Sequence, residues 1–450
     1  MLMKSRGTER LVAVLRILRR RESLLLLALA GAATVVILSH VFHRAPPVSR
    51  TSGPLPHAAY VWQRAWDDGV RSAVARASDH VTALHVLAAE VAWQGNRPRV
   101  VHVPIDFAAL RDTSPSVGLA IRIGPFSGPF AETDANARLL TQLASDTIGR
   151  ARAAGIEVRE LQIDFDAAAS KLADYRIWVT ALRRAARPVP LIITALPSWL
   201  SRAEFRRLAE ASDGFVLQVH SLERPQHADD PMTLCDPAAA TAAVERAARL
   251  GLPFRVALPT YSYLVAFDRD DRFVGLQAEG PPLTWPPDTR LRALRANPSE
   301  LAALVQTWNA DRPAALQGII WYRLPVAGDA LNWHWSTLSS VMSGHTPRAI
   351  LHATAERSAP GLIDLVLTND GDADAPLPQT VTILWADAPL LACDALAGYE
   401  PSTPSDTTVL YSLRHNTALQ WLPPEGRRVL GWLRLGSDTE VQINVTPSPP

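Results

Sequence analysis

Short apolar runs alternate with helical patterns through most of the sequence, and this alternation limits the folds that the chain can adopt. Eight runs have the length of a buried strand: residues 59–66, 82–91, 117–126, 158–166, 190–200, 214–222, 254–263 and 316–326. Segments between them, such as ANARLLTQLASDTIGRARAAG, repeat apolar residues every three or four positions, which indicates helices. Strands that alternate with helices form parallel sheets. We therefore predict an α/β fold, a (β/α)8 TIM-like barrel over residues 58–344, with a doubly wound sheet as the alternative.

Two segments interrupt this alternation. Residues 92–116 contain an extra extended piece in place of a long helix, and residues 261–297 form a long insertion before the last helix and strand. Long insertions at the carboxyl ends of barrel strands usually shape the active site. We therefore expect residues 262–297 to cover part of the mouth of the barrel.

The pattern changes after about residue 345. Runs such as LIDLVLTN and TVTILWA alternate apolar and polar residues, turns separate them, and the sequence shows no helical period there. A period of two predicts antiparallel strands. Residues 345–450 are therefore expected to form a small C-terminal antiparallel β-sandwich.

The N-terminus has the pattern of a membrane anchor. Residues 1–22 form a basic arm with seven Lys and Arg against two acids, and residues 23–42 carry no formal charge. About 20 apolar residues span a bilayer, and a basic arm stays in the cytoplasm. We predict a single-pass inner-membrane helix, a linker over residues 43–57 and a body in the bacterial periplasm. The alternative is a cleaved signal peptide, suggested by Ala28, Ala30, Ala32 and Ala33, which would leave the body secreted or periplasmic.

Charge and cysteine content exclude some functions. The net charge is +1 and the first 22 residues contribute +5, so the remainder carries −4 and nucleic acid is not an expected partner. Cys235 and Cys393 either form one disulfide or remain free thiols. No metal-binding or cofactor motif occurs in the sequence, so we expect neither a metal nor a cofactor.

Two carboxylates stand at the end of the fourth apolar run, in LQIDFD. Side chains alternate along a strand, so Asp164 and Asp166 share one face with Gln162, while the apolar residues share the other. In a barrel the apolar face packs on the helices, which leaves the acids inside, where an ionised carboxylate is costly unless it is paired. Polar residues of other strands that we expect near them are Arg122, Thr194, Gln218, His220, Arg255, Tyr261 and Tyr263. The alternative is that the aspartates begin a loop and that one of them caps the next helix.

The stretch LQIDFD, the tyrosine-bearing helix after it and IITALPSWL resemble the bacterial family Domain of Unknown Function 3142. This resemblance implies a barrel followed by a sandwich, and no assigned activity. More distantly, the fourth strand resembles the chitinase-like glycoside hydrolases of family 18, whose strand ends in D-x-x-D-x-D-x-E. Asp164 and Asp166 match the last two aspartates of that pattern. Ala168 stands at the position of the proton-donating glutamate and Leu161 at that of the first aspartate, so the donor of the chitinase mechanism is missing.

A glycosidase needs a protonated carboxyl group and a second carboxylate. We expect Asp166, which is nearer the mouth, to be the acid, because the like charge of Asp164 would raise the pKa of one member of the pair. The second carboxylate is Asp164 itself, Glu90 at the end of the second strand, or Glu223 after the sixth.

Aromatic residues bear on the kind of substrate. The chain has 13 tryptophans, and sugar rings stack well on indoles, although core packing is the alternative for each one. The residues expected to bind substrate are Trp62, Arg122, Trp199, His220, Tyr261 and Trp321. Together these features predict a membrane-tethered, glycoside-hydrolase-like protein that acts on an envelope or exported polysaccharide. The alternative is a non-catalytic saccharide-binding or scaffold protein on the same barrel.

The predicted topology can be tested directly. A reporter that is active only in the cytoplasm, fused after Pro450, should be inactive, because the positive-inside rule places the body outside. The body should also stay with the membrane fraction after osmotic shock, whereas its release would favour cleavage. Strong activity of the cytoplasmic reporter would contradict the prediction.

Overall fold

The computed structural model describes residues 48–446, apart from residues 96, 114, 222–223, 281–282 and 415–420. The predicted basic arm, the apolar segment 23–42, the first part of the predicted linker and the candidate Glu223 lie outside the described residues. Within the described ranges, no helix has the length and apolar character needed to span a membrane.

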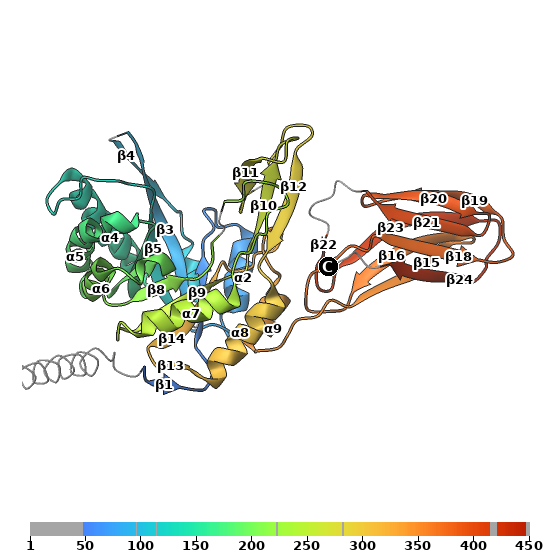
Figure 1. Cartoon of the computed structure of the whole chain (residues 1–450). Helices are drawn as coiled ribbons and strands as arrows, with labels where there is room; N and C mark the ends of the chain where they lie inside the picture. Colours follow the sequence, from blue (N-terminus) through green and yellow to red (C-terminus); the bar gives the residue numbers. More distant parts are fainter. Residues whose placement is uncertain are drawn as a thin grey trace, which may run out of the picture. The chain divides into compact units, whose positions relative to one another are not determined.

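Eight parallel strands close into a barrel (Figure 1). They are β2 (His57–Val61), β3 (Ala83–Gln94), β5 (Ser116–Ile123), β6 (Val158–Phe165), β7 (Leu191–Ala195), β8 (Phe215–Gln218), β9 (Phe254–Pro259) and β14 (Leu316–Tyr322). Each strand pairs with the next in this order, and β2 pairs with both β3 and β14, so the ring is complete. The predicted barrel and its eight strands are confirmed, and the doubly wound sheet is excluded.

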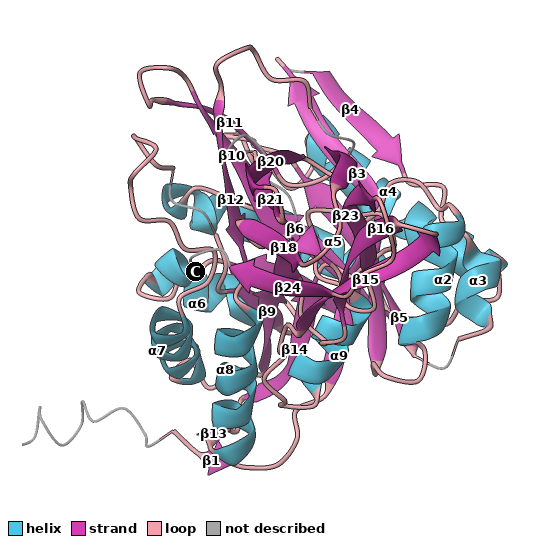
Figure 2. Ribbon diagram, turned by 90° about the vertical axis from the view of Figure 1, so that its right-hand side faces the viewer, coloured by secondary structure: helices cyan, strands magenta, loops and turns pink. Residues whose placement is uncertain are grey.

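A helix follows each barrel strand and covers the outside of the ring (Figure 2). These helices are α2 (Asp68–Ala77), α3 (Phe107–Arg111), α4 (Ala135–Ala153), α5 (Leu172–Ala186), α6 (Ala203–Glu210), α7 (Pro237–Ala248), α8 (Pro298–Ala310) and α9 (Trp335–Met342). Their starts follow local chemistry, because the side chains of Asp67, Asp134 and Asp236 accept backbone N–H groups in the first turns of α2, α4 and α7. These caps fix the residues at which α2, α4 and α7 begin.

Two antiparallel additions extend the carboxyl end of the barrel. β3 continues into a hairpin with β4 (Arg97–His102), which is the extra extended piece expected within residues 92–116. The insertion forms a separate sheet of β10 (Ser262–Phe267), β11 (Phe273–Gln277) and β12 (Arg290–Arg295). Figures 1 and 2 show both additions rising beyond the ends of the barrel strands. The mouth therefore has a wall on each of these two sides.

The last residues of the predicted linker take part in the fold. The short strand β1 (Arg50–Thr51) pairs with β13 (Arg312–Pro313). Arg50 makes ion pairs with Asp311 at 2.6 Å and Glu245 at 2.8 Å, and Leu55 is buried. Composition suggested a linker, but these contacts attach the chain to the barrel from residue 50 onwards.

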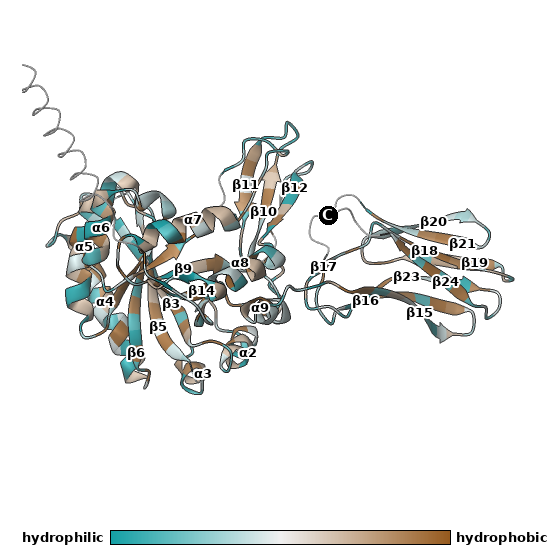
Figure 3. Ribbon diagram, turned by 60° about the horizontal axis from the view of Figure 1, so that its bottom comes forward, coloured by the Kyte–Doolittle hydropathy of each residue, from teal (hydrophilic) through white to brown (hydrophobic). Residues whose placement is uncertain are grey.

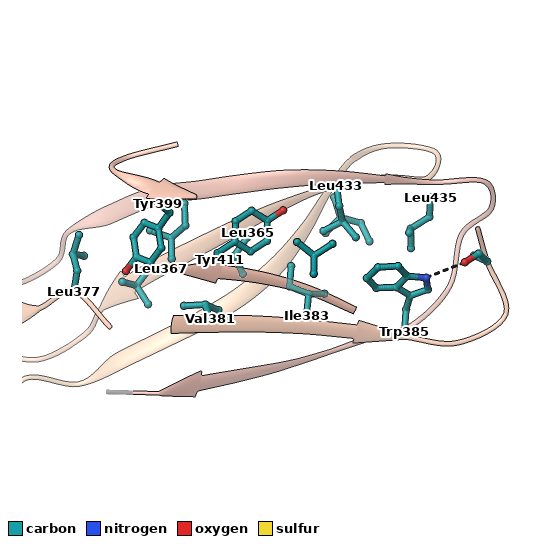
Figure 4. Packing of buried hydrophobic residues seen from close by; sticks show 14 of the residues in the cluster. Leu365, Leu367, Leu377, Val381, Ile383, Trp385, Tyr399, Tyr411, Leu433 and Leu435 are labelled. Atoms are coloured by element: carbon teal, nitrogen blue, oxygen red, sulfur yellow. Dashed lines mark hydrogen bonds between the residues drawn. The ribbon is translucent and has the colours of Figure 1, made fainter. Parts of the chain in front are cut away.

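The C-terminal part is an antiparallel β-sandwich, as predicted. One sheet contains β15 (Leu351–Ala359), β16 (Leu362–Asn369), β23 (Arg427–Leu435) and β19 (Leu390–Ala395). The other contains β20 (Tyr399–Ser405), β21 (Thr408–Leu413), β18 (Thr380–Trp385) and β24 (Val441–Thr446), and β17 (Ala375–Pro376) pairs with β22 (Trp421–Leu422). Figure 4 shows the core between the sheets, where the indole N–H of Trp385 donates to the carbonyl of Ala388 at 2.9 Å. Cys393 of this sandwich and Cys235 of the barrel are both free thiols.

Side chains of β6 alternate as expected from the sequence. Phe165 faces outward and packs on Tyr175 and Trp178 of α5. Gln162 and Asp164 point into the barrel, where they contact side chains of other strands. Figure 3 shows brown and teal residues alternating along the barrel strands. The interior of this barrel is therefore partly polar, unlike the branched apolar filling of most such barrels.

The packing of this interior yields a stability prediction. Gly118 of β5 faces the ring of His85, and an added Cβ would meet that ring and the Cγ of Glu160, the latter at 3.2 Å. Gly118→Ala should therefore lower the free energy of unfolding by roughly 1–3 kcal/mol. The matched control is Gly149→Ala in α4, where a Cβ meets nothing within 4 Å. This control should be stabilising by up to about 1 kcal/mol, because alanine favours a helix. Urea unfolding checks both, and equal stability of the two variants would contradict the described interior.

Candidate active site at the mouth of the barrel

A cavity of about 380 Å³ opens at the carboxyl ends of the barrel strands. Its lining comes from β2, β5, β6, β7, β8, β9 and β14, from the loops that follow them, and from β10 of the insertion. The residues predicted from the sequence that lie there are Trp62, Arg122, Asp164, Asp166, Thr194, Gln218, His220, Tyr261 and Tyr263. The fold thus brings these side chains together from segments that are far apart in the chain.

Asp164 is the deeper of the two acids. Its Oδ1 accepts hydrogen bonds from the hydroxyl of Thr194 at 3.0 Å and from the amide of Gln218 at 3.2 Å. Burial and the negative charge of Asp166 raise the pKa of Asp164 to about 6, although Arg122 and the two hydrogen bonds oppose this rise. Since both bonds end on Oδ1, a proton on this carboxyl group resides on Oδ2.

Asp166 follows the strand and is exposed at the rim of the cavity. Burial by neighbouring protein atoms also raises the pKa of Asp166, and the positive charge of Arg122 opposes the rise. Among the residues that the structure describes, no side chain or backbone group makes a hydrogen bond or ion pair with Asp166. The negative charge of Asp166 favours the protonated form of Asp164, so ionisation of the outer carboxyl group helps the inner one to keep its proton.

Glu90 lies beside the cavity rather than in its lining. Both oxygens of Glu90 bind Arg64, at 2.6 and 2.9 Å, and Arg122 approaches one of them at 3.6 Å. Arg64 also reaches Glu279 of the insertion at 3.1 Å. These four side chains connect the loop after β2, the ends of β3 and β5, and the insertion. They therefore hold the rim in position, with Glu90 shared by two guanidinium groups.

A cluster of aromatic rings forms another side of the cavity. Tyr322 at the end of β14 lies 5.4 Å from Trp62 and 5.6 Å from His220, measured between ring centroids. Tyr261 and Tyr60 contact the same ring at 5.5 and 5.8 Å. Tyr60 and Tyr322 were not predicted from the sequence. Each follows an outward-facing residue of its strand, Ala59 or Trp321, and strand alternation could therefore have predicted that both tyrosines point inward. Ring faces and hydroxyl groups at a cavity of this size suit a sugar.

Two predicted substrate-binding tryptophans are not at the cavity. Trp321 is buried, and its indole N–H donates to Nδ1 of His57 at 3.1 Å. It neighbours Tyr322 on the same strand, so strict alternation points it outward. Trp199 is buried against Phe205 of α6, because it lies in a short turn, Pro197–Trp199, that folds back on the helices. The structure places both side chains in the core of the barrel wall.

A second polar layer lies beneath the acids. The hydroxyl of Tyr60 donates to Gln162 at 2.6 Å, and the amide of Gln162 contacts Glu160 at 2.7 Å and His85 at 3.0 Å. Arg255 binds Glu160 at 2.7 Å. Burial lowers the pKa of His85 to about 4, so its ring is neutral at pH 7. This network pairs the polar side chains of the layer beneath the acids and holds the hydroxyl of Tyr60 in place. Over the described part of the chain, no three His, Cys, Asp or Glu side chains gather as a metal site would require.

Two family models match parts of the chain. Residues 117–327 match the family model described as Domain of unknown function (DUF3142), which confirms the resemblance inferred from the sequence. Residues 352–436 match a second model, Domain of unknown function (DUF8456), within the sandwich. Among curated proteins, none matches the chain in sequence.

Several solved structures are similar to this chain at low identity. The Bacillus cereus spore cortex-lytic enzyme SleL is 12% identical, with a TM-score of 0.46, over 66% of this chain and 75% of that chain. A chitinase from Chromobacterium violaceum ATCC 12472 is 15% identical, with a TM-score of 0.43, over 64% and 98%. Chitinase ChiA74 from Bacillus thuringiensis is 10% identical, with a TM-score of 0.40, over 87% and 100%. Similarities this distant carry no argument about the chemistry of the site.

The pKa of Asp164 yields a prediction about stability. A pKa of about 6 in place of 3.8 means that the folded state binds this proton more tightly than the unfolded state does. The associated stability is therefore fully present below pH 3.8 and is lost as the pH rises through about 6, by roughly 3 kcal/mol in total. Asp164→Asn keeps the amide oxygen as acceptor and cannot ionise, so it should be more stable than the wild type at pH 8 but not at pH 4.

Urea unfolding at a series of pH values measures this difference. The matched control is Asp79→Asn on the surface, which is expected to leave the pH dependence of the unfolding free energy unchanged. If Asp164→Asn lost stability at pH 8, the carboxylate would be a net stabilising group, and the description of its surroundings given above would be wrong.

Proposed function

We propose that this protein hydrolyses glycosidic bonds of a polysaccharide at the mouth of its barrel, with Asp164 and Asp166 as the reacting carboxyl groups. The observation that supports this most is the contrast between the two. Asp164 is held inside the barrel with its pKa raised to about 6, whereas Asp166 is exposed and free of partners among the described residues. Glycoside hydrolysis needs such a pair, one group protonated and one ionised at the same pH.

The contrast also supports an assignment of roles. From the sequence, Asp166 was expected to donate the proton because it is nearer the mouth. As the pH is lowered, buried Asp164 binds a proton before Asp166 does. This proton is on Oδ2, because Oδ1 already accepts two hydrogen bonds. We therefore assign proton donation to Asp164 and the role of nucleophile or base to Asp166. Glu90, the other candidate carboxylate, is bound to Arg64 and is assigned to positioning.

The aromatic side of the cavity supports a saccharide substrate. Tyr322, Trp62 and His220 offer ring faces and polar edges next to the acids, and sugar rings have apolar C–H faces and many hydroxyl groups. The choice of an envelope or exported polysaccharide follows from the N-terminal pattern, a basic arm before an apolar segment. In this proposal the barrel works outside the cytoplasm, tethered to the inner membrane.

Two variants test the roles of the acids. A proton donor matters most when the leaving group is a poor one, so Asp164→Asn should reduce turnover of an oligosaccharide by roughly 10²–10⁴-fold and that of an activated nitrophenyl glycoside much less. Asp166→Asn should impair both substrates, and added azide should restore part of the activity by replacing the missing nucleophile. The opposite pattern would return proton donation to Asp166. Full activity of both variants would reject the site.

The second candidate function is saccharide binding without catalysis. It is favoured by Ala168, an exposed residue where the chitinase-like pattern has its proton-donating glutamate. In that case the wild type, Asp164→Asn and Asp166→Asn should all bind oligosaccharides and none should release products. Ala168→Glu, which restores the missing acid, should then create turnover on the same substrate. Turnover by the wild type decides against this alternative.

A further inference from the structure

The β3–β4 hairpin presents one face to the mouth of the barrel. Glu90 pairs with Arg122 in the parallel ladder, and both point inward. Alternation along β3 places Ala92 and Gln94 on the same face as Glu90. On the opposite face, the ring of Trp93 packs on Phe126 of the loop after β5 and on Trp178 of α5. The direction of the hairpin is therefore fixed by contacts on both of its faces.

Arginines lie on the mouth-facing side of this hairpin. Directly opposed residues in an antiparallel ladder share a face, and the register pairs Ala92 with Arg99 and Gln94 with Arg97. Arg97 and Arg99 are exposed, and among the described residues neither side chain has an ion pair or hydrogen bond. Together with Arg64 and Arg122 at the rim they form a strip of four guanidinium groups, which we call the arginine strip. Gln94 is four positions beyond Glu90 on β3, so the strip extends on the order of 13 Å from the cavity.

Acidic side chains, including Asp164 and Asp166, which interact with Arg122, balance this charge at the cavity end of the strip but not at its outer end. Glu90 and Glu279 are the carboxylates that bind Arg64, and Arg122 is only 3.6 Å from an oxygen of Glu90 that Arg64 already engages. Arg97 and Arg99 have no such partner among the described residues. The ordinary explanation of exposed arginines is solvation, but these share one face of a wall that leads into the cavity containing the acid pair. Such an arrangement attracts anions along the path to the site.

A second observation points to an acceptor on the ligand. The indole N–H of Trp62 is buried and has no hydrogen-bond partner in the described structure, and Trp62 lines the cavity. An acceptor oxygen of a ligand that reached this N–H would relieve the cost of leaving a buried donor unpaired. The strand order β2, β3, β5 places Trp62 and Arg122 on the same side of the mouth, flanking the end of β3. The donor and the arginine strip thus serve one side of the cavity.

We propose that the substrate is an acidic polysaccharide whose uronic acid carboxylates bind along the arginine strip while a glycosidic bond lies at Asp164 and Asp166. Carboxylates fit this surface because the guanidinium group binds them with two parallel hydrogen bonds. A chain with a charge on each sugar makes several such contacts at once. The proposal rests on the proposed function, since it names the substrate class for the same site.

Matched oligosaccharides test the proposal. The probes are oligogalacturonate, alginate oligomers, the carboxyl-reduced form of each, and neutral chito-oligosaccharide, measured by calorimetry with the full-length protein. The acidic oligomers should bind at least tenfold more tightly than their reduced forms, and their affinity should fall as salt is raised, because exposed charges are screened. The double variant Arg97→Gln/Arg99→Gln should weaken binding of the acidic oligomers by roughly tenfold, from two lost exposed contacts.

The matched control removes two charges elsewhere. Arg152 at the end of α4 and Arg187 after α5 are exposed at the opposite end of the barrel from the mouth. Arg152→Gln/Arg187→Gln should leave affinity for the acidic oligomers unchanged, which separates a local strip from an effect of net charge. Tighter binding of the neutral or reduced oligomers, or equal effects of the two double variants, would overturn the acidic-substrate proposal and leave the proposed function standing. If no probe binds or is cleaved, the proposed function itself fails.

Discussion

The burial of a carboxyl group inside the barrel is the constraint on which the site depends. A charged group loses hydration there, and Thr194, Gln218 and Arg122 return only part of that loss, so the pKa of Asp164 stays raised, at about 6. The remaining cost is borne by the rest of the fold. Packing on the outer face of β6 contributes to this, since the rings of Phe165, Tyr175 and Trp178 are buried together on the other side of the same strand. A strand with an apolar outer face and a polar inner face can therefore keep a carboxyl group buried. A loop would expose the group to water, and an ordinary core strand would give it no polar partners.

A carboxyl group in that position is useful only if the surrounding walls stay in place. The Arg64 and Glu90 pair fixes the end of β3 to the loop after β2, and Glu279 extends the same network to the insertion. Because these side chains are partly exposed, each ion pair alone contributes little stability. Their joint effect is geometric, since they limit the positions that the two walls of the mouth can adopt. Below the acids, Tyr60 and Gln162 act similarly, connecting the floor of the cavity to Glu160 and Arg255.

The sequence predicted the periodic features of this molecule well and the non-periodic ones less well. All eight barrel strands, the sandwich and the inward direction of Asp164 follow from periods of two and of three to four, because those periods report which face is buried.

Trp199 and Trp321 show the limit of that reasoning. A tryptophan near a strand end reads the same whether it faces the cavity or the helices, and only the register of the preceding residues decides. The Arg64, Glu90 and Glu279 network joins residues more than 200 positions apart, and no local pattern encodes such a contact. Strand β1 was not predicted for a different reason. The composition around Arg50 is that of a linker, and the ion-pair partners of Arg50 lie in α7 and directly after α8.

Arg122 connects the acid pair to the proposed substrate. Its positive charge lowers the pKa of both Asp164 and Asp166 in the free protein. A uronic acid carboxylate bound to Arg122 would neutralise that charge and so withdraw the effect that favours the ionised acids. The pair would then hold its proton more firmly, and to a higher pH, with substrate present than without it. Since Ala168 leaves the strand without the glutamate of the chitinase-like pattern, a donor that is kept protonated by the charge of its own substrate is a physical alternative to a third acid.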